Sequence, residues 1–227
     1  LTPMGFVNLI HESPYFFGTQ RPQVERSIIP STWREMGVGL FGEILPGLTY
    51  TTYVMNGLNA RNFTSSGIRG GRQSGSKVKA EDLAWVGRVD YSPPVYPGLS
   101  FGASAYLGDS AQSQTYSGQR VDAFTQLYEA HLQWKYRGLE FRALGAWGHI
   151  DDAAALSAEK GETIGSSNYG WYTEAGYNVL PLVFPDTLQY LAPFFRYEQY
   201  DTIASVPNGY ADDGNLDRQI FQFGLNY

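Results

Sequence analysis

The last eight residues, IFQFGLNY, alternate between two kinds of side chain. Phe221, Phe223, Leu225 and Tyr227 are apolar or aromatic, and the residues between them are small or polar. A period of two residues is the period of a β-strand whose two faces meet different surroundings. The same alternation recurs along the chain in runs of about ten residues, the length that a tilted strand needs to cross a bilayer. These runs predict an all-β chain whose last strand turns its apolar side chains toward lipid.

The connections between the runs are alternately short and long. This alternation is typical of an antiparallel up-and-down transmembrane β-barrel, with short turns at one end and long loops at the other. A soluble β-sandwich with the rings in its core is the alternative, but it does not require such alternation. We expect one domain over residues 1–227. The ten predicted strands are 4–10, 35–43, 48–56, 83–92, 99–107, 122–136, 139–149, 169–179, 189–199 and 218–227.

Composition excludes several classes of protein. The chain has no cysteine, which removes disulfides and thiolate metal sites. Its formal charge of -6 argues against a nucleic-acid binder, which normally has a basic face. No apolar run is long enough for a spanning helix. The chain starts at Leu1 without a signal peptide, so we expect a processed form or a piece of a longer protein.

The side chains opposite the apolar set are polar and carry both signs of charge. Such a lining suits a water-filled channel, and charges of opposite sign could equally pair across neighbouring strands. Ten strands alone would be nearly filled by their own side chains, because open channels need about 16 strands. The predicted pore-lining residues are Arg88, Asp90, Glu129, Lys135, Arg142, Glu174, Arg196 and Glu198.

Four stretches in the first 93 residues resemble outer-membrane porins of the phosphate-selective porin O/P type. They include an inward-folding loop that ends in Glu25-Arg26-Ser27, a strand with Gly37-Val38, and a strand that closes on Asn56-Gly57. After residue 93 only the strand rhythm persists. The stretches are ERSIIPSTWREMGVGLFGEI at 25–44, LTYTTYVMNGLNA at 48–60, SSGIRGGRQ at 65–73 and WVGRVDYSP at 85–93.

Because members of that family are longer, the resemblance implies that this chain is an interior portion of a larger porin barrel. It implies a passive diffusion channel for small hydrophilic solutes or ions in the outer membrane of a Gram-negative-type bacterium. The family's dense ladders of cationic residues are missing here, because the chain has 16 Lys and Arg residues and 22 Asp and Glu residues. At most weak anion selectivity is therefore expected. Expected partners are the lipid bilayer, lipopolysaccharide and the solutes, with a homotrimer as a candidate assembly and no nucleic acid.

Residues 11–35 form a connection too long and too apolar for a simple solvated loop. A barrel interior of porin width would give it a place to pack, and the resemblance implies an inward-folded constriction. We therefore predict that Arg21, Glu25, Arg26 and Arg34 form the pore constriction, with the arginines favouring anions. An external loop packed on a neighbouring subunit is the alternative.

Motifs for other chemistry are weak. His149 lies beside Asp151 and Asp152, as in a pair that activates water, but no Gly-x-Ser-x-Gly motif accompanies it. ADDGNLD at 211–217 has oxygen ligands without the EF-hand spacing. The basic stretch 66–79 is not a phosphate-binding P-loop, and we interpret it as a solvated loop. We therefore expect no enzyme activity, metal or cofactor. The alternative function is a small ten-stranded outer-membrane barrel that acts as a surface enzyme or binding protein.

Overall fold

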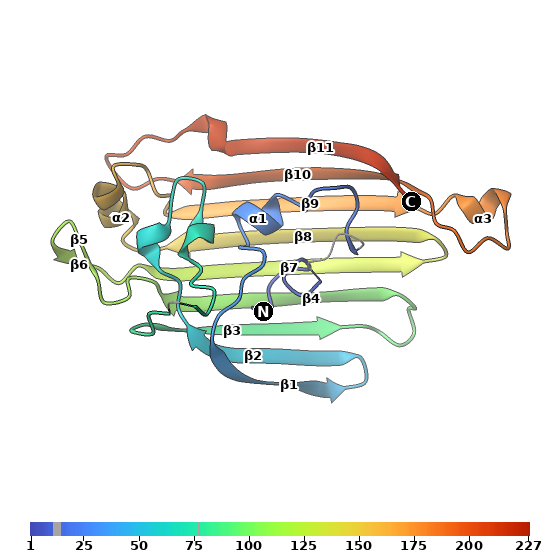
Figure 1. The fold of residues 1–227 in the computed structure, drawn as a ribbon, viewed down its shortest axis with the longest axis horizontal. Coiled ribbons are helices and arrows are strands. Elements are labelled where there is room, and N and C mark those ends of the chain that lie inside the picture. Colours follow the sequence, from blue (N-terminus) through green and yellow to red (C-terminus); the bar gives the residue numbers. More distant parts are fainter. Residues whose placement is uncertain (11–14, 77) are drawn as a thin grey trace.

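The computed structural model describes residues 1–10, 15–76 and 78–227. In these residues nine strands form one antiparallel sheet in which each strand pairs with the next strand of the sheet along the chain. The connection from β4 to β7 forms a separate hairpin, β5–β6, beyond the end of the sheet (Figure 1). The strands are β1 (Gly37–Leu45), β2 (Leu48–Asn56), β3 (Leu83–Tyr91), β4 (Leu99–Asp109), β5 (Thr115–Tyr116), β6 (Gln119–Arg120), β7 (Phe124–Tyr136), β8 (Leu139–Ile150), β9 (Ser167–Tyr177), β10 (Ala192–Ser205) and β11 (Asp217–Asn226). The all-β, antiparallel up-and-down arrangement is thereby confirmed.

The strand predicted at 4–10 is wrong. Residues 5–9 form a turn, in which the amides of Leu9 and Ile10 donate to the carbonyl of Phe6. Gly5 has a φ of +66°, and a Cβ there would lie 2.5 Å from the Glu25 carboxylate. Met4 and Val7 are buried, whereas Leu9 and Ile10 are 45% and 44% exposed, so the spacing of the apolar residues here reflects local packing rather than strand pairing.

The long connections gather at one end of the sheet and the short turns at the other (Figure 1). Outside the strands, the described part of the chain has three short helices and three 3-10 turns. Arg61 links the long connection after β2 to two others, since its side chain pairs with Glu159 at 3.4 Å and donates to the carbonyl of Thr115. The helical elements are α1 (Val24–Ser27), η2 (Ala60–Asn62), η3 (Ile68–Gly71), α2 (Ala153–Lys160), α3 (Leu180–Val183) and η4 (Gly214–Leu216).

The sheet is not closed. β1 and β11 are its two edges, and in the described residues each pairs with one strand only. Side chains on both edge strands are largely exposed, including Phe41 at 77% and Phe223 at 76%. Closure into a barrel and placement across a membrane therefore stay predictions.

Residues 1–36 cross one face of the sheet, which we call the covered face (Figure 1). Trp33, on this segment, is fully buried and packs on Tyr106 of β4 with 4.9 Å between ring centroids. Val24 and Ile28 of the segment belong to the same core, together with Leu127 of β7. The core thus lies between the N-terminal segment and the sheet, nearer the end with the long loops.

The opposite face, which we call the open face, exposes large apolar side chains. Trp171 and Tyr197 lie on neighbouring strands of this face with 5.0 Å between ring centroids, and Tyr128 stacks on Trp147. Rings paired across strands stabilise a sheet, but here they are not covered by another layer. Open-face side chains that are at least 40% exposed include Trp85, Phe101, Trp134, Trp147, Trp171, Phe195 and Phe221.

Candidate pore lining and constriction

Charged side chains fill the middle of the covered face in two groups. The first group joins β3 and β7. The Arg88 guanidinium lies 2.6 Å from Asp90 and 3.8 Å from Glu129, and His131 bridges the two carboxylates at 2.9 and 3.0 Å. Arg88 also donates to the carbonyl of Gly5 at 2.7 Å. This group therefore pairs charges across the strands and also holds the start of the N-terminal segment.

The second group joins β8, β9 and β10. Glu174 lies between two arginines, at 2.7 Å from Arg196 and 3.3 Å from Arg142. Arg196 is fully buried and donates to the carbonyls of Phe17 and Gln20. Charge-assisted hydrogen bonds of this kind fix both position and orientation. The second group therefore holds the middle of the N-terminal segment against the sheet.

All eight predicted lining residues lie on the covered face, as their register shows. Six of them belong to the two groups, and Glu198, 4.0 Å from Arg196, accepts a hydrogen bond from the amide of Val24 at 3.1 Å. Lys135 lies apart, at the end with the short turns, where it pairs with Glu140 at 2.7 Å. Pairing across strands, one of the two roles expected for these charges, is thus present. The N-terminal segment covers most of them.

The predicted constriction residues separate into three places. Arg21 and Arg26 line a cavity of about 280 Å³ together with Gln20, Gln23, Ser31 and Arg69. Arg34 is exposed and lies outside that lining. Residues 11–14, the first part of the predicted constriction loop, lie outside the described residues.

Arg69 and Arg72 were not among the residues selected from the sequence. Both donate to the carbonyl of Ser31, which connects the loop after β2 to the N-terminal segment. Burial and the neighbouring Arg72, Arg26 and Arg21 lower the pKa of Arg69 to about 10. The basic stretch 66–79 was the signal that could have identified them, but a glycine-rich basic segment also fits a solvated loop. Of that stretch, Lys77 lies outside the described residues.

Glu25 points away from the arginine cavity and into the core. Its carboxylate accepts hydrogen bonds from the amide of Val7 and the hydroxyl of Tyr172, both at 2.6 Å. Burial raises the pKa of Glu25 from 4.5 to about 7, and the hydrogen bonds only partly oppose this effect. Glu25 therefore anchors α1 to β9.

The other weak motifs have local structural roles. His149 pairs with Asp151 at 3.1 Å on an exposed part of the loop end, stacked beside Trp147. Within ADDGNLD, Asp213 caps η4 by accepting from the amide of Asn215. Among the described residues, no cluster of three or more His, Asp or Glu side chains is arranged to hold a metal ion. No helix in the described part of the chain is long and apolar enough to span a membrane.

Comparison with known proteins finds a relative that is longer than this chain. No family model matches the chain. The chain is similar to an uncharacterized protein of Aquifex aeolicus (strain VF5), with 35% identity over 239 residues. That similarity takes in the whole of this chain but 53% of the relative, so the chain spans about half the length of the protein it matches.

Proposed function

We propose that the protein is an outer-membrane porin that forms a passive diffusion channel for small hydrophilic solutes or ions. One observation carries the proposal: a single up-and-down sheet exposes aromatic and aliphatic side chains on its open face and holds charged side chains on its covered face. In a transmembrane barrel the first face meets lipid and the second faces the lumen. A soluble sandwich would instead bury such rings between two layers.

We further propose that additional strands close the sheet into a larger barrel. The unpaired edges of β1 and β11 support this, because backbone groups exposed to lipid must be hydrogen-bonded. The length of the relative supports it too, since about half of that protein lies outside the matched part. In a barrel of about 16 strands, the N-terminal segment would occupy part of the lumen and leave room for solutes.

The solute path in this proposal passes the arginine cavity, where Arg21, Arg26 and Arg69 lie together. Like charges held close together attract anions, even though the whole chain is acidic. The expected selectivity is weak, because ion pairs neutralise most other charges on the covered face.

A second candidate function is a barrel that binds a ligand without conducting. The filling of the covered face favours it, since Trp33, Met4 and Arg196 have no exposed surface. This candidate predicts a folded protein in bilayers without channel activity.

Planar-bilayer recording of the full-length protein tests the proposal. The wild type should give discrete conductance steps and a reversal potential on the anion side in a salt gradient. Arg26→Glu should shift the reversal potential toward cation selectivity. Arg120, an exposed residue of the β6 hairpin, provides the control, and Arg120→Glu should leave the reversal potential unchanged. Folded protein without conductance steps would contradict the channel and favour the binding barrel. Steps with equal shifts in both variants would contradict the assigned path.

A further inference from the structure

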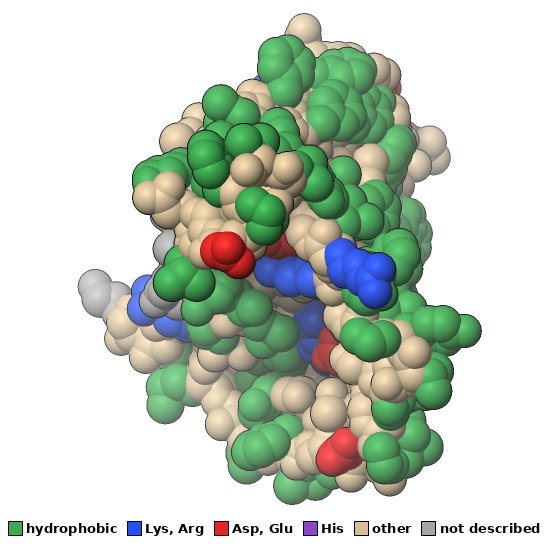
Figure 2. Space-filling view, turned by 90° about the vertical axis from the view of Figure 1, so that its right-hand side faces the viewer, with side chains coloured by type: hydrophobic (Ala, Val, Ile, Leu, Met, Phe, Trp, Pro, Cys, Tyr) green, Lys and Arg blue, Asp and Glu red, His purple; other side chains and the backbone are tan. Residues whose placement is uncertain are grey.

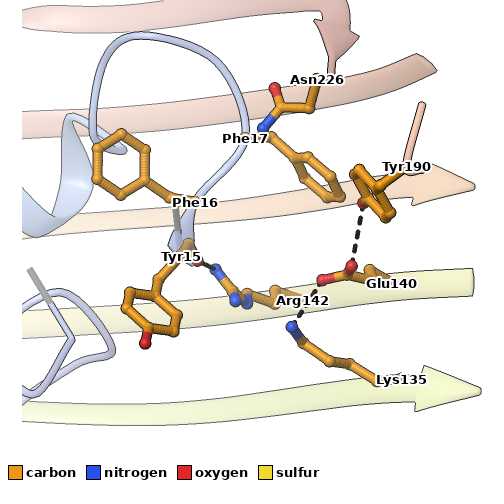
Figure 3. Close-up of a pocket in the computed structure, with 8 residues that line it drawn as sticks. All are labelled: Tyr15, Phe16, Phe17, Lys135, Glu140, Arg142, Tyr190 and Asn226. Atoms are coloured by element: carbon orange, nitrogen blue, oxygen red, sulfur yellow. Dashed lines mark hydrogen bonds and ion pairs between the residues drawn. The ribbon is translucent and has the colours of Figure 1, made fainter. Parts of the chain in front are cut away.

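A pocket opens on the covered face at the end with the short turns. Viewed from that end, charged side chains gather in a hollow surrounded by hydrophobic ones (Figure 2). The pocket holds about 230 Å³ and is built from five parts of the chain (Figure 3). Its lining residues are Tyr15, Phe16 and Phe17 of the N-terminal segment, Lys135 of β7, Glu140 and Arg142 of β8, Tyr190 before β10, and Asn226 of β11.

The charges of the lining leave capacity to bind an anion. Lys135 and Arg142 are cations, and among the lining residues that the structure describes Glu140 is the only carboxylate. Both oxygens of Glu140 are already engaged, one by Lys135 at 2.7 Å and the other by the Tyr190 hydroxyl at 3.0 Å. Lys135 has three N–H donors, so two remain beyond this pair, and its side chain is 44% exposed.

Arg142 adds donors deeper in the pocket. Within the described part of the chain, its hydrogen bonds to the carbonyl of Tyr15 and to Glu174 both use Nη1. Nε and Nη2 have no hydrogen bond to the described residues, although the guanidinium also lies over the Phe6 ring, 5.6 Å from its centroid. Arg142 therefore adds donors to a pocket that Lys135 also lines. Two cations facing one space suit a carboxylate, which accepts charge-assisted hydrogen bonds at each oxygen.

Aromatic rings form the rest of the wall. Phe17 is held in place by stacking on Phe194, with ring centroids 5.2 Å apart and planes 9° apart. Tyr15 and Tyr190 present further rings from two sides (Figure 3). Rings in such a wall bind a flat apolar body by offset or edge contacts. The volume lies below the roughly 300–1,000 Å³ of pockets for drug-sized molecules, so the ligand is small.

We propose that this pocket binds a small organic anion with one carboxylate on a single ring. The inference goes beyond diffusion through the channel, because binding here does not require that the solute crosses the membrane. Its failure and the failure of channel activity are therefore separate results.

The test is calorimetry of the full-length protein in nanodiscs, with empty nanodiscs subtracted. Benzoate is the probe, acetate lacks the ring, and benzyl alcohol lacks the charge. We expect benzoate to bind at least about tenfold more tightly than either, since each lacks one of the two recognised features. Lys135→Gln should weaken benzoate binding about tenfold, the effect of losing a charge-assisted hydrogen bond.

Two control variants complete the design. Lys135→Arg keeps the charge and should retain binding within about threefold. Lys160→Gln removes an exposed lysine at the end of α2, at the opposite end of the sheet, and should change nothing. Benzyl alcohol or acetate binding as tightly as benzoate would overturn the proposed ligand class. Equal binding by the wild type and a folded Lys135→Gln variant would overturn the site.

Discussion

The Glu25 carboxylate accepts a hydrogen bond from the Tyr172 hydroxyl, with 2.6 Å between the oxygens, although the two residues are 147 positions apart in the sequence. Its other oxygen accepts from the amide of Val7 at 2.6 Å. Glu25 is almost fully buried, so this one carboxyl group joins two parts of the N-terminal segment to β9 without contact with water.

The first prediction concerns the pH dependence of stability. Because the pKa of Glu25 is raised from 4.5 to about 7, the folded state keeps a proton that the unfolded state loses in this range. Its contribution to the unfolding free energy should therefore fall as pH rises from about 4.5 to about 7, by on the order of 3 kcal/mol. Glu25→Gln, which mimics the protonated group, should remove this part of the dependence in denaturant titrations. A variant whose pH profile parallels that of the wild type would contradict the assignment.

The second prediction compares a buried ion pair with an exposed one. Arg196→Met leaves Glu174 and Glu198 buried beside a missing cation and should cost about 3–5 kcal/mol of unfolding free energy. Lys135→Met breaks a partly exposed pair and should cost about 1 kcal/mol or less. Urea titrations of both variants measure the difference. Equal losses of unfolding free energy in the two variants would show that the second charge group does not hold the N-terminal segment against the sheet.

The third prediction concerns the anchoring of the N-terminal segment. Trp33→Ala empties a fully buried site against Tyr106 and should cost about 3–5 kcal/mol. Phe41 lies on the covered-face side of β1, and its side chain is 77% exposed. Phe41→Ala should therefore lower the unfolding free energy much less. Limited proteolysis followed by mass spectrometry should find new cuts within residues 15–36 in Trp33→Ala only. Cuts confined to the loops after β2 would contradict the anchoring role.

Much of the sheet could be predicted from the sequence because alternation reports directly which side of a strand is apolar. Phe221, Phe223 and Leu225 stand on one face of β11, and Arg88 and Arg196 stand on the other face of the sheet, as the period of two requires. The segment around Gly5 could not be predicted, because buried residues in an irregular segment imitate strand spacing. Its true form depends on contacts with Glu25 and Arg88, which lie far away in the sequence.

The candidate site was predictable only in part for a related reason. Sequence spacing places Arg142 and Glu174 on the same face, but it does not reveal that they pair with each other and lie under the N-terminal segment. The grouping of Arg69 with Arg21 and Arg26 depends on how two separate connections pack, which no local pattern records.

Spin-label accessibility along β4 tests the central claim, that the open face meets lipid and the covered face does not. The chain has no native cysteine, so single cysteines can be placed at residues 100–107 in turn. In lipid vesicles we predict that labels at Phe101, Ala103, Ala105 and Leu107 are accessible to oxygen and shielded from a water-soluble nickel chelate. Labels at the residues between them should either be reached by the nickel chelate rather than by oxygen, or be poorly accessible to both. Open-face labels that are readily reached by the nickel chelate would contradict the account.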